Sequence, residues 1–369
     1  MLATIAGSSL LVVRQDAATN LRDNNSKKEK IRLQFRKEKG IGGNGDVATF
    51  TVLQLTDMHL GEAENLDWGP EADRKTFGVL ESVLDYEDES TIDFVVVTGD
   101  QLTANNIDDN ATDYYRMVGD FLQSRSIPYA MIFGNHDDAP LDNDPPDSQP
   151  TEVLPAKANR TQLVLTDQTH SFSLSEVGPS SLYGVSNFVL PVWGSSATDP
   201  QMLQIFLLDS GGGSLPTRVD RSHLDWFRSQ RTTTTTTAAV VFQHVPTKQF
   251  RFNKDRCAGF NGDNGIDPVL EDAGLVQTLQ DDGNVHFLAV GHMHGNSYCC
   301  STTDGNNKNN NKNETLLHLC FGRHSGYGGY GSSDRGGRLY QFRHEQNQLR
   351  WRSWVRLESG ETVDRYDSP

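Results

Sequence analysis

The sequence predicts an α/β fold, and three observations lead to that prediction. Short apolar runs alternate with segments of helical period, as they do in strand–helix–strand units. One run, 92–98, is apolar along nearly its whole length, as expected of a strand that is covered on both faces. Polar side chains follow the runs directly, at the position where open α/β sheets bind their ligands.

In the first half of the chain the expected elements alternate regularly. Apolar and basic side chains alternate in the first strand, and apolar residues recur at helical spacing in the two helices. The expected strands are 31–36, 50–56, 92–98 and 129–133, the expected helices are 71–85 and 111–125, and a Gly-rich turn covers 40–45.

The second half begins with a Pro- and Asp-rich surface excursion, 138–169, which we expect to contain one short helix. Strand patterns dominate after it. The expected strands are 171–177, 182–192, 202–208, 238–242, 285–290 and 316–321, followed by a closing β-hairpin over 338–357, and the one expected helix is 220–230.

These patterns indicate one large domain, 31–357. A polar and charged leader, 1–30, precedes it, and a tail, 358–369, follows it. The Asn-rich segment 304–313 is of low complexity and is expected to be a solvated insert, and the six-Thr run 232–237 is expected to be a loop.

The charge balance restricts the kinds of partner. The chain has 369 residues, with 33 Lys and Arg against 49 Asp and Glu, for a net charge of −16. Nucleic-acid binding is therefore not expected, because it depends on neutralising phosphates with Lys and Arg. No apolar run approaches the roughly 20 residues of a transmembrane segment. The first 13 residues are mildly apolar but lack the basic flank of a signal peptide. We therefore expect a soluble protein, and both a cytoplasmic and a secretory location stay open.

The four cysteines do not form a metal-binding pattern. Cys257, Cys299, Cys300 and Cys320 include no C-x-x-C pair, which excludes a zinc ribbon. A disulfide from Cys299 or Cys300 to Cys320 is left open, and the sequence does not determine the redox state.

Metal-binding residue types follow five of the expected strands. Taken together they supply two carboxylates, one amide and five imidazoles, which suit Mn, Fe or Zn, whereas the absence of thiolates argues against a structural zinc site. Each cluster alone has a plainer interpretation as a turn or a core histidine, but five in this arrangement favour one site. The residues are Asp57 and His59, Asp100, Asn135 and His136, His244, and His292 and His294.

Eight groups are more than one ion needs, and they nearly fill two coordination shells that share a carboxylate. In two-metal hydrolytic sites the ions lie about 3.5–4 Å apart. Asp100 is the best candidate for the shared carboxylate, because it follows the central strand and has no neighbouring ligand residue.

Together with the adjacent Gly99, Gly134, Asp137 and Gly291, this set of residues resembles the calcineurin-like metallophosphoesterase superfamily over about 50–295. The segment 320–330 further resembles a purple acid phosphatase-like branch of fungi and plants. The resemblance implies a four-layer αββα sandwich of two mixed β-sheets flanked by helices. It also implies two divalent or trivalent metal ions and phosphoester hydrolysis.

The resemblance also implies a role for each residue. One ion would be held by Asp57, His59, Asp100 and His294, and the other by Asp100, Asn135, His244 and His292. His136 would stabilise the phosphoryl oxygens or protonate the leaving group. Purple acid phosphatases place a Tyr where this chain has Thr103, and they lack a His at the position of His59, so a calcineurin-type metal pair is expected. The partner that orients His136 is not identified.

The expected activity is that of a phosphomonoesterase that uses metal-bound hydroxide against a phosphoprotein or a small phosphoester. A phosphodiesterase or nucleotide hydrolase with the same metal core is the alternative. A metal-binding scaffold without catalysis is the third hypothesis, which the presence of every expected ligand and of His136 disfavours.

The Gly-rich segment 322–330 has two interpretations. Its composition is typical of a flexible surface loop. Alternatively, Arg323 and His324 follow a short apolar run in the same manner as the metal-binding clusters, and would bind substrate phosphate. Tyr327 and Tyr330 would then contact the organic part of the substrate.

Overall fold

The protein is described here by a computed structural model. It describes residues 31–38, 47–87, 91–141, 154–231, 237–302, 316–346 and 348–368. The predicted leader 1–30, the Gly-rich turn 40–45, the insert 304–313 and most of the six-Thr run lie outside the described residues.

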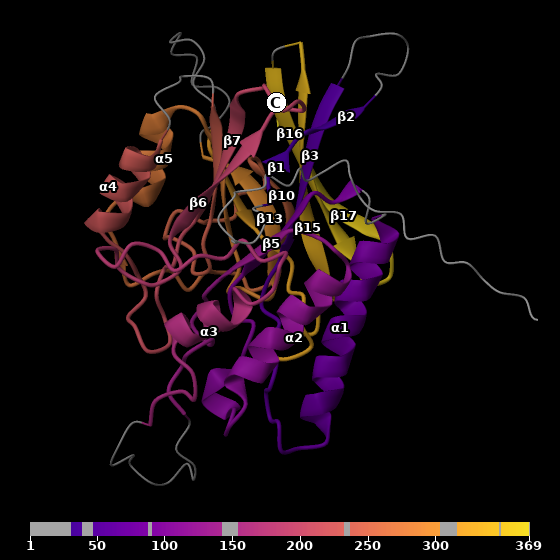
Figure 1. Cartoon of the computed structure of the whole chain (residues 1–369), viewed down its shortest axis with the longest axis vertical. Helices are drawn as coiled ribbons and strands as arrows, with labels where there is room; N and C mark the ends of the chain where they lie inside the picture. The colour runs from indigo at the N-terminus through magenta and orange to yellow at the C-terminus, as the bar shows by residue number, and fades with distance from the viewer. Residues whose placement is uncertain are drawn as a thin grey trace, which may run out of the picture.

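Two mixed β-sheets form the centre of the molecule (Figure 1). In the seven-stranded sheet the central strands are parallel and the C-terminal strands are antiparallel. Its order is β17 (Thr362–Asp367), β16 (Gln348–Leu357), β15 (Gly336–Glu345), β3 (Val47–Leu55), β4 (Phe94–Thr98) and β5 (Tyr129–Ile132), and β2 (Arg36–Glu38) also pairs with β3.

In the eight-stranded sheet the central strands β7, β9, β12 and β14 are parallel to one another. Its order is β1 (Leu33–Gln34), β6 (Phe188–Trp193), β7 (Gln201–Leu207), β9 (Ala238–Phe242), β12 (Val285–Val290), β14 (His318–Phe321), β13 (Asn296–Ser301) and β10 (Cys257–Asn261). A separate two-stranded sheet joins β8 (Arg218–Val219) to β11 (Glu271–Asp272).

Helices cover the outer face of each sheet. The seven-stranded sheet carries α1 (Trp68–Tyr86), α2 (Ala111–Ser124) and α3 (Arg160–Asp167), and the eight-stranded sheet carries α4 (Arg221–Gln230) and α5 (Leu275–Asp282). Figure 1 shows the two groups of helices on opposite sides of the sheets. The expected four-layer αββα sandwich is therefore confirmed.

Strand β3 shows why the central strands are apolar along their whole length. Leu53 and Leu55 pack into the core beneath the helices, whereas Phe50 and Val52 pack into the core between the sheets. Because successive side chains point to opposite faces of a sheet, a strand with helices on one side and a second sheet on the other is buried on both faces.

Three expected strands are wrong in detail. The expected strand 182–192 begins only at Phe188, as β6. The expected strand 31–36 is divided, because β1 pairs with β6 of one sheet and β2 pairs with β3 of the other. The expected strand 171–177 is absent. Ser173 forms one isolated bridge with Tyr129. Two residues later, the Ser175 hydroxyl rather than a backbone carbonyl accepts the Met131 N–H, so the strand pairing does not continue.

Several elements were not predicted. The structure adds α5, the strand pair β10 and β13, and β17, which pairs with β16 in the segment taken as a tail. Disulfides join Cys257 to Cys300 and Cys299 to Cys320, so β13 is bonded covalently to the strand on either side of it. In the part of the chain that the structure describes, no helix is both long and apolar enough to cross a membrane.

A buried histidine couples α2 to α3 and predicts a pH dependence of stability. His170 Nε2 lies 3.0 Å from Asp120 Oδ1, and Nδ1 lies 3.0 Å from the Asp167 carbonyl oxygen. Hydrogen bonding to Asp167 and to Asp120 raises the pKa of His170 to about 9. The protonated ring therefore stabilises the folded state fully below the unfolded pKa of about 6.5, and this contribution is lost as the pH rises through about 9.

We expect His170→Gln to lower the free energy of unfolding more at pH 6 than at pH 10. Urea unfolding of both proteins at the two pH values measures the difference. Equal differences at pH 6 and pH 10 would show that the charge of His170 is not the stabilising feature.

Candidate metal centre

The candidate ligands lie where strands of both sheets end. Strands β3, β4 and β5 lead into the segments that carry Asp57, Asp100 and Asn135, and strands β9 and β12 lead into those that carry His244 and His292. Hydrogen bonds connect the two sheets at this edge. One joins the Gln54 amide to the Val290 carbonyl (3.1 Å), and another brings His244 Nδ1 to 2.8 Å from the Thr98 carbonyl.

Four of these residues have left-handed backbone conformations. The φ angles of Asp57, His59, Asp100 and His292 are 57°, 50°, 52° and 73°. Non-glycine residues seldom adopt such angles, and those that do concentrate at functional sites. These conformations turn the chain sharply after each strand, so that the side chains project into a shared space.

Glycines beside the ligands allow this close approach. A Cβ on Gly99, where φ is 95°, would lie 2.6 Å from His244 Nδ1, and a Cβ on Gly134 would lie 2.2 Å from Asp100 Oδ1. Neither position has room for a side chain, which explains why glycine precedes Asp100 and Asn135.

One group of donors consists of Asp57, His59 and His294. One donor atom from each lies within 4.8 Å of the other two. His59 Nε2 is 3.1 Å from His294 Nε2, and His294 Nε2 is 3.6 Å from Asp57 Oδ1. All three side chains are buried, so a cation there would be shielded from water.

A second group consists of Asp100, His244 and His292, again within 4.8 Å of one another. Asn135 Oδ1 extends this group, since it lies 3.1 Å from His244 Nε2. Asp100 Oδ2 lies 3.1 Å from His244 Nε2 and 3.6 Å from His59 Nε2. Asp100 therefore lies between the two groups.

The charge state of the carboxylates fits a cation site. Burial opposes ionisation of Asp57, but a hydrogen bond with His294 and the charge of His244 hold its pKa well below the usual range. Burial likewise opposes ionisation of Asp100, and the charges of His244 and His136 outweigh it, so its pKa is also lowered strongly. Two buried carboxylates that remain ionised require compensating positive charge.

His136 is placed beside the donors and contacts a residue that the sequence did not identify. Its Nδ1 lies 3.4 Å from Asn105 Oδ1, and its backbone N–H donates to Asp100 Oδ1 (2.7 Å). Thr103 instead lies beside His59, with its hydroxyl oxygen 3.1 Å from Nδ1. His136 also falls within metal-binding distance of His59 and Asp100, so geometry alone allows it to be a ligand.

Asp137 is a second residue whose role the sequence did not reveal. Its carboxylate accepts the backbone N–H groups of Asp100 (3.0 Å), Leu102 (3.0 Å) and Gly134 (2.7 Å). Burial together with the charge of Asp100 raises its pKa to about 7. Asp137 thus holds the turns after β4 and β5 together, and the segment that carries Asp100 depends on it.

The placement of Arg323 does not support its predicted contact with substrate. The side chain is buried, and it donates to the Asp334 carbonyl (2.8 Å) and the Ser297 hydroxyl (3.1 Å). Its guanidinium therefore stabilises the segment after β14. His324 is buried too, with its ring 3.9 Å from that of His294, so it lies behind a candidate ligand.

The tyrosines of the Gly-rich segment also contact protein groups. The Tyr330 ring stacks on His294, with 4.1 Å between ring centroids and 8° between planes, and its carbonyl oxygen lies 2.7 Å from His294 Nδ1. Tyr327 donates its hydroxyl to Glu358 (2.9 Å). The segment therefore supports His294, and the expectation of a wall that contacts the substrate finds no support here.

A cleft of about 510 Å³ opens beside the donors. Asn135, His136 and His292 form part of its lining. Its remaining lining is mainly apolar and includes Pro140, Leu215, Pro216, Val245, Pro268 and Leu270, with Asp267 beside His292. None of the residues that line the cleft, in the parts of the chain described, is Lys or Arg.

Comparison with known proteins agrees with this geometry. The family model for calcineurin-like phosphoesterases matches residues 50–296, the span that contains all the candidate metal ligands. The matched span covers more than half of the chain.

Curated relatives include a phosphatase. Phosphatase DCR2 of Saccharomyces cerevisiae is 27% identical over 350 residues, which are 85% of this chain and 54% of that protein. Probable inactive purple acid phosphatase 28 of Arabidopsis thaliana is 24% identical over 323 residues, which are 78% of this chain and 72% of that protein. The chain thus spans about half the length of the yeast relative.

Among solved structures, purple acid phosphatase PPD1 from yellow lupin seeds aligns with a TM-score of 0.47 at 15% sequence identity. The alignment covers 92% of this chain and 56% of the lupin chain.

Proposed function

Because the chain belongs to the calcineurin-like phosphoesterase family, we propose that it is a phosphomonoesterase that depends on two metal ions. The observation that carries the proposal is the position of Asp100 between two groups of donors, one buried and one that opens to the cleft through His292. A single carboxylate shared in this way is what two adjacent ions require.

The donors present fit two ions of Mn, Fe or Zn. Asp57, His59, Asp100 and His294 would hold one ion, and Asp100, Asn135, His244 and His292 would hold the other. Carboxylate, amide and imidazole ligands without thiolates suit these metals. When bound, the ions would neutralise the phosphoryl oxygens and activate a water for in-line attack.

His136 is the proposed general acid. If Asn105 Oδ1 accepts the Nδ1–H, the ring is held with Nε2 free to carry the second proton. That proton would pass to the leaving oxygen of the ester, which would otherwise depart as an alkoxide. General acid catalysis by a positioned histidine contributes about 10²–10⁴-fold.

The cleft supports a substrate with an apolar organic part. Among the described residues its lining provides proline and leucine side chains but no Lys or Arg, so the phosphoryl charge would be met by the ions and by His136. A phosphorylated side chain with apolar neighbours, or a small aryl or alkyl phosphate, fits this arrangement. A diester or nucleotide substrate remains the alternative, since the same donors would serve it.

An assay panel tests the proposed function. We expect p-nitrophenyl phosphate to be hydrolysed with added Mn²⁺, and bis-p-nitrophenyl phosphate to be hydrolysed much more slowly. Preference for the bis ester would make the protein a phosphodiesterase. No turnover with Mn²⁺, Fe²⁺ or Zn²⁺ would favour a non-catalytic role, as the name of the Arabidopsis relative suggests for that protein.

Replacing His136 separates general acid catalysis from metal binding. We expect His136→Ala to keep both ions and to lower kcat by about 10²-fold or more, because the leaving group would lose its proton donor. Metal analysis beside steady-state kinetics measures both quantities. Loss of one ion in the variant would instead identify His136 as a ligand.

A further inference from the structure

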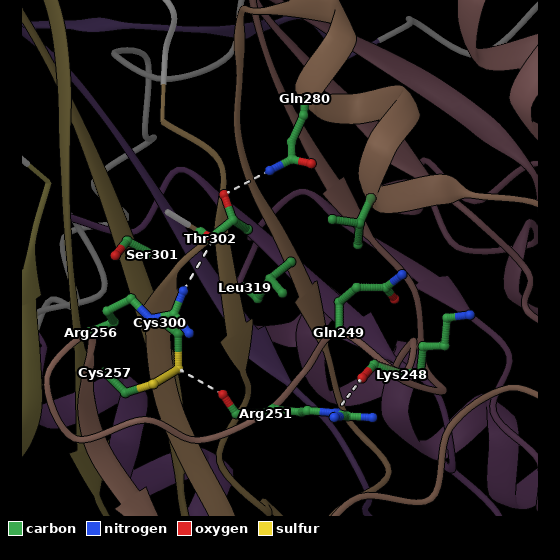
Figure 2. A pocket seen from close by; sticks show the side chains of 11 residues that line it. Lys248, Gln249, Arg251, Arg256, Cys257, Gln280, Cys300, Ser301, Thr302 and Leu319 are labelled. Carbon is green, nitrogen blue, oxygen red and sulfur yellow. Dashed lines mark hydrogen bonds between the residues drawn. A yellow bond between two sulfur atoms is a disulfide. The ribbon is translucent and has the colours of Figure 1, made fainter. Parts of the chain in front are cut away.

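A second cavity, of about 420 Å³, lies among residues that do not belong to the metal centre (Figure 2). We call it the basic cavity. It is bounded by the segment after β9, the start of β10, α5 and the end of β13, and shares no lining residue with the cleft. Its lining residues are Lys248, Gln249, Arg251, Arg256, Cys257, Val276, Gln280, Cys300, Ser301, Thr302 and Leu319.

The charge of this lining is opposite to that of the chain. The described residues of the lining include Lys248, Arg251 and Arg256 and no Asp or Glu, although the whole chain carries −16. Within the described ranges, no carboxylate forms an ion pair with Lys248 or Arg251. Lys248 and Arg251 are like charges beside one hollow, so they repel each other, and a bound anion would relieve that repulsion.

The walls of the basic cavity are held in place by covalent and hydrogen bonds. The Cys257–Cys300 disulfide joins β10 to β13 and forms part of the lining (Figure 2). Arg256 donates to the Thr302 carbonyl (3.3 Å), and the Gln280 amide donates to the Thr302 hydroxyl (3.0 Å). A site arranged in advance loses little entropy when a ligand binds.

The segment that carries Lys248 and Arg251 is also anchored. Phe250 is buried between them, with its ring 5.1 Å from that of Phe321. Arg251 Nε donates to the Lys248 carbonyl (3.2 Å), which fixes one edge of the guanidinium. Beside them, Gln249 Oε1 is buried and accepts no hydrogen bond from any residue in the described parts of the chain. Buried polar atoms normally have a partner, so a donor on a ligand would complete this site.

We propose that the basic cavity is a binding site for a small organophosphate anion that carries hydroxyl groups. The phosphoryl group would lie beside Lys248 and Arg251, and a hydroxyl would donate to Gln249 Oε1. The volume lies within the range of about 300–1,000 Å³ typical of small-molecule sites. This inference does not depend on the proposed catalytic activity.

The test uses the full-length, metal-loaded protein and isothermal titration calorimetry. The probes are inorganic phosphate and 3,4-dihydroxybutyl-1-phosphonate, whose C–P bond no phosphatase hydrolyses. Because either anion is also expected to bind the metal centre, inhibition of p-nitrophenyl phosphate hydrolysis reports that site separately. We expect calorimetry to resolve a second site that inhibition does not.

The decisive variant is Lys248→Gln combined with Arg251→Gln, and the matched control is Lys254→Gln, an exposed lysine outside the lining. Removing two charged donors should weaken the second site by about tenfold or more. The metal content, the KM for p-nitrophenyl phosphate and the inhibition constant should not change. Equal calorimetric affinity in the double variant and the control would overturn the proposal.

A second variant tests the hydroxyl contact. Gln249→Leu should weaken binding of the dihydroxybutyl phosphonate severalfold and leave inorganic phosphate unaffected. If both anions bind Gln249→Leu as they bind the unmodified protein, recognition of a hydroxylated ligand is wrong. A chain without phosphatase activity that still shows the charge-dependent calorimetric site would refute the proposed function and support the basic cavity.

Discussion

Asp100→Asn is expected to remove at least one metal ion per chain and to lower kcat by more than about 10²-fold, because loss of a residue that only supports a ligand already costs about 10–100-fold. Asp100 lies between both groups of donors, with Oδ2 3.1 Å from His244 Nε2 and 3.6 Å from His59 Nε2. Asp57 also approaches both groups, but its Oδ1 is farther from the rings, at 3.6 Å from His294 Nε2 and 3.9 Å from His244 Nε2. Asn keeps an oxygen that can accept the backbone N–H of His136, but it lacks the negative charge that two cations would share. The variant therefore changes the charge and leaves the shape of the turn.

Elemental analysis and steady-state kinetics on the same preparations measure this effect. Asp113→Asn is the matched control, because Asp113 is an exposed carboxylate paired with Arg116 on α2, outside the metal centre. Two tightly bound ions in Asp100→Asn would contradict the shared-ligand assignment.

Arg160→Ala is expected to lower the free energy of unfolding by about 3–5 kcal/mol, the usual cost of removing one partner from a buried ion pair. Arg160 is 2% exposed, and its guanidinium bonds to both Asp138 and Asp209. Two buried carboxylates would lose their counter-charge in the variant.

The same side chain also positions the wall of the cleft. Arg160 donates to the carbonyls of Gly134 (2.9 Å) and Gly212 (2.7 Å), so it links the segment that carries His136 to the segment after β7. Urea unfolding measures the stability, and Arg116→Ala, which breaks an exposed pair, should have little effect. If Arg160→Ala lowers the free energy of unfolding as little as Arg116→Ala does, the buried carboxylates find other partners in the variant.

The strands at the centre of the sheets could be predicted from local sequence. The expected strands 238–242 and 285–290 coincide with β9 and β12. Both are continuous apolar runs that end at a polar cluster, because each is covered by a sheet and by helices. The edge elements could not be predicted in this way. Strand β13 is polar and cysteine-rich, and its burial depends on neighbours from distant parts of the chain.

The sequence by itself determined which residues meet at the candidate metal centre. Within each sheet, polar residues that follow neighbouring parallel strands lie at one edge, whatever the connections between the strands are. The packing of the two sheets then brings the two edges together. The same rule gave a misleading result for Arg323. It also follows a buried strand, but its side chain is buried, and Nε and one Nη donate to the Asp334 carbonyl and the Ser297 hydroxyl.

Only the tertiary structure decided what supports the ligands. Asn105 beside His136 and Tyr330 over His294 lie several residues beyond the strand ends. Asp137 does follow β5 closely, but nothing in its local sequence shows that its carboxylate accepts the Asp100 N–H. The pairing of Cys257 with Cys300, which encloses the basic cavity, depends in the same way on β10 lying against β13. A periodic pattern shows which face of a helix or strand is buried. A contact between two irregular segments depends instead on where the folded sheets place the ends of those segments, and that placement is determined by residues along the whole chain.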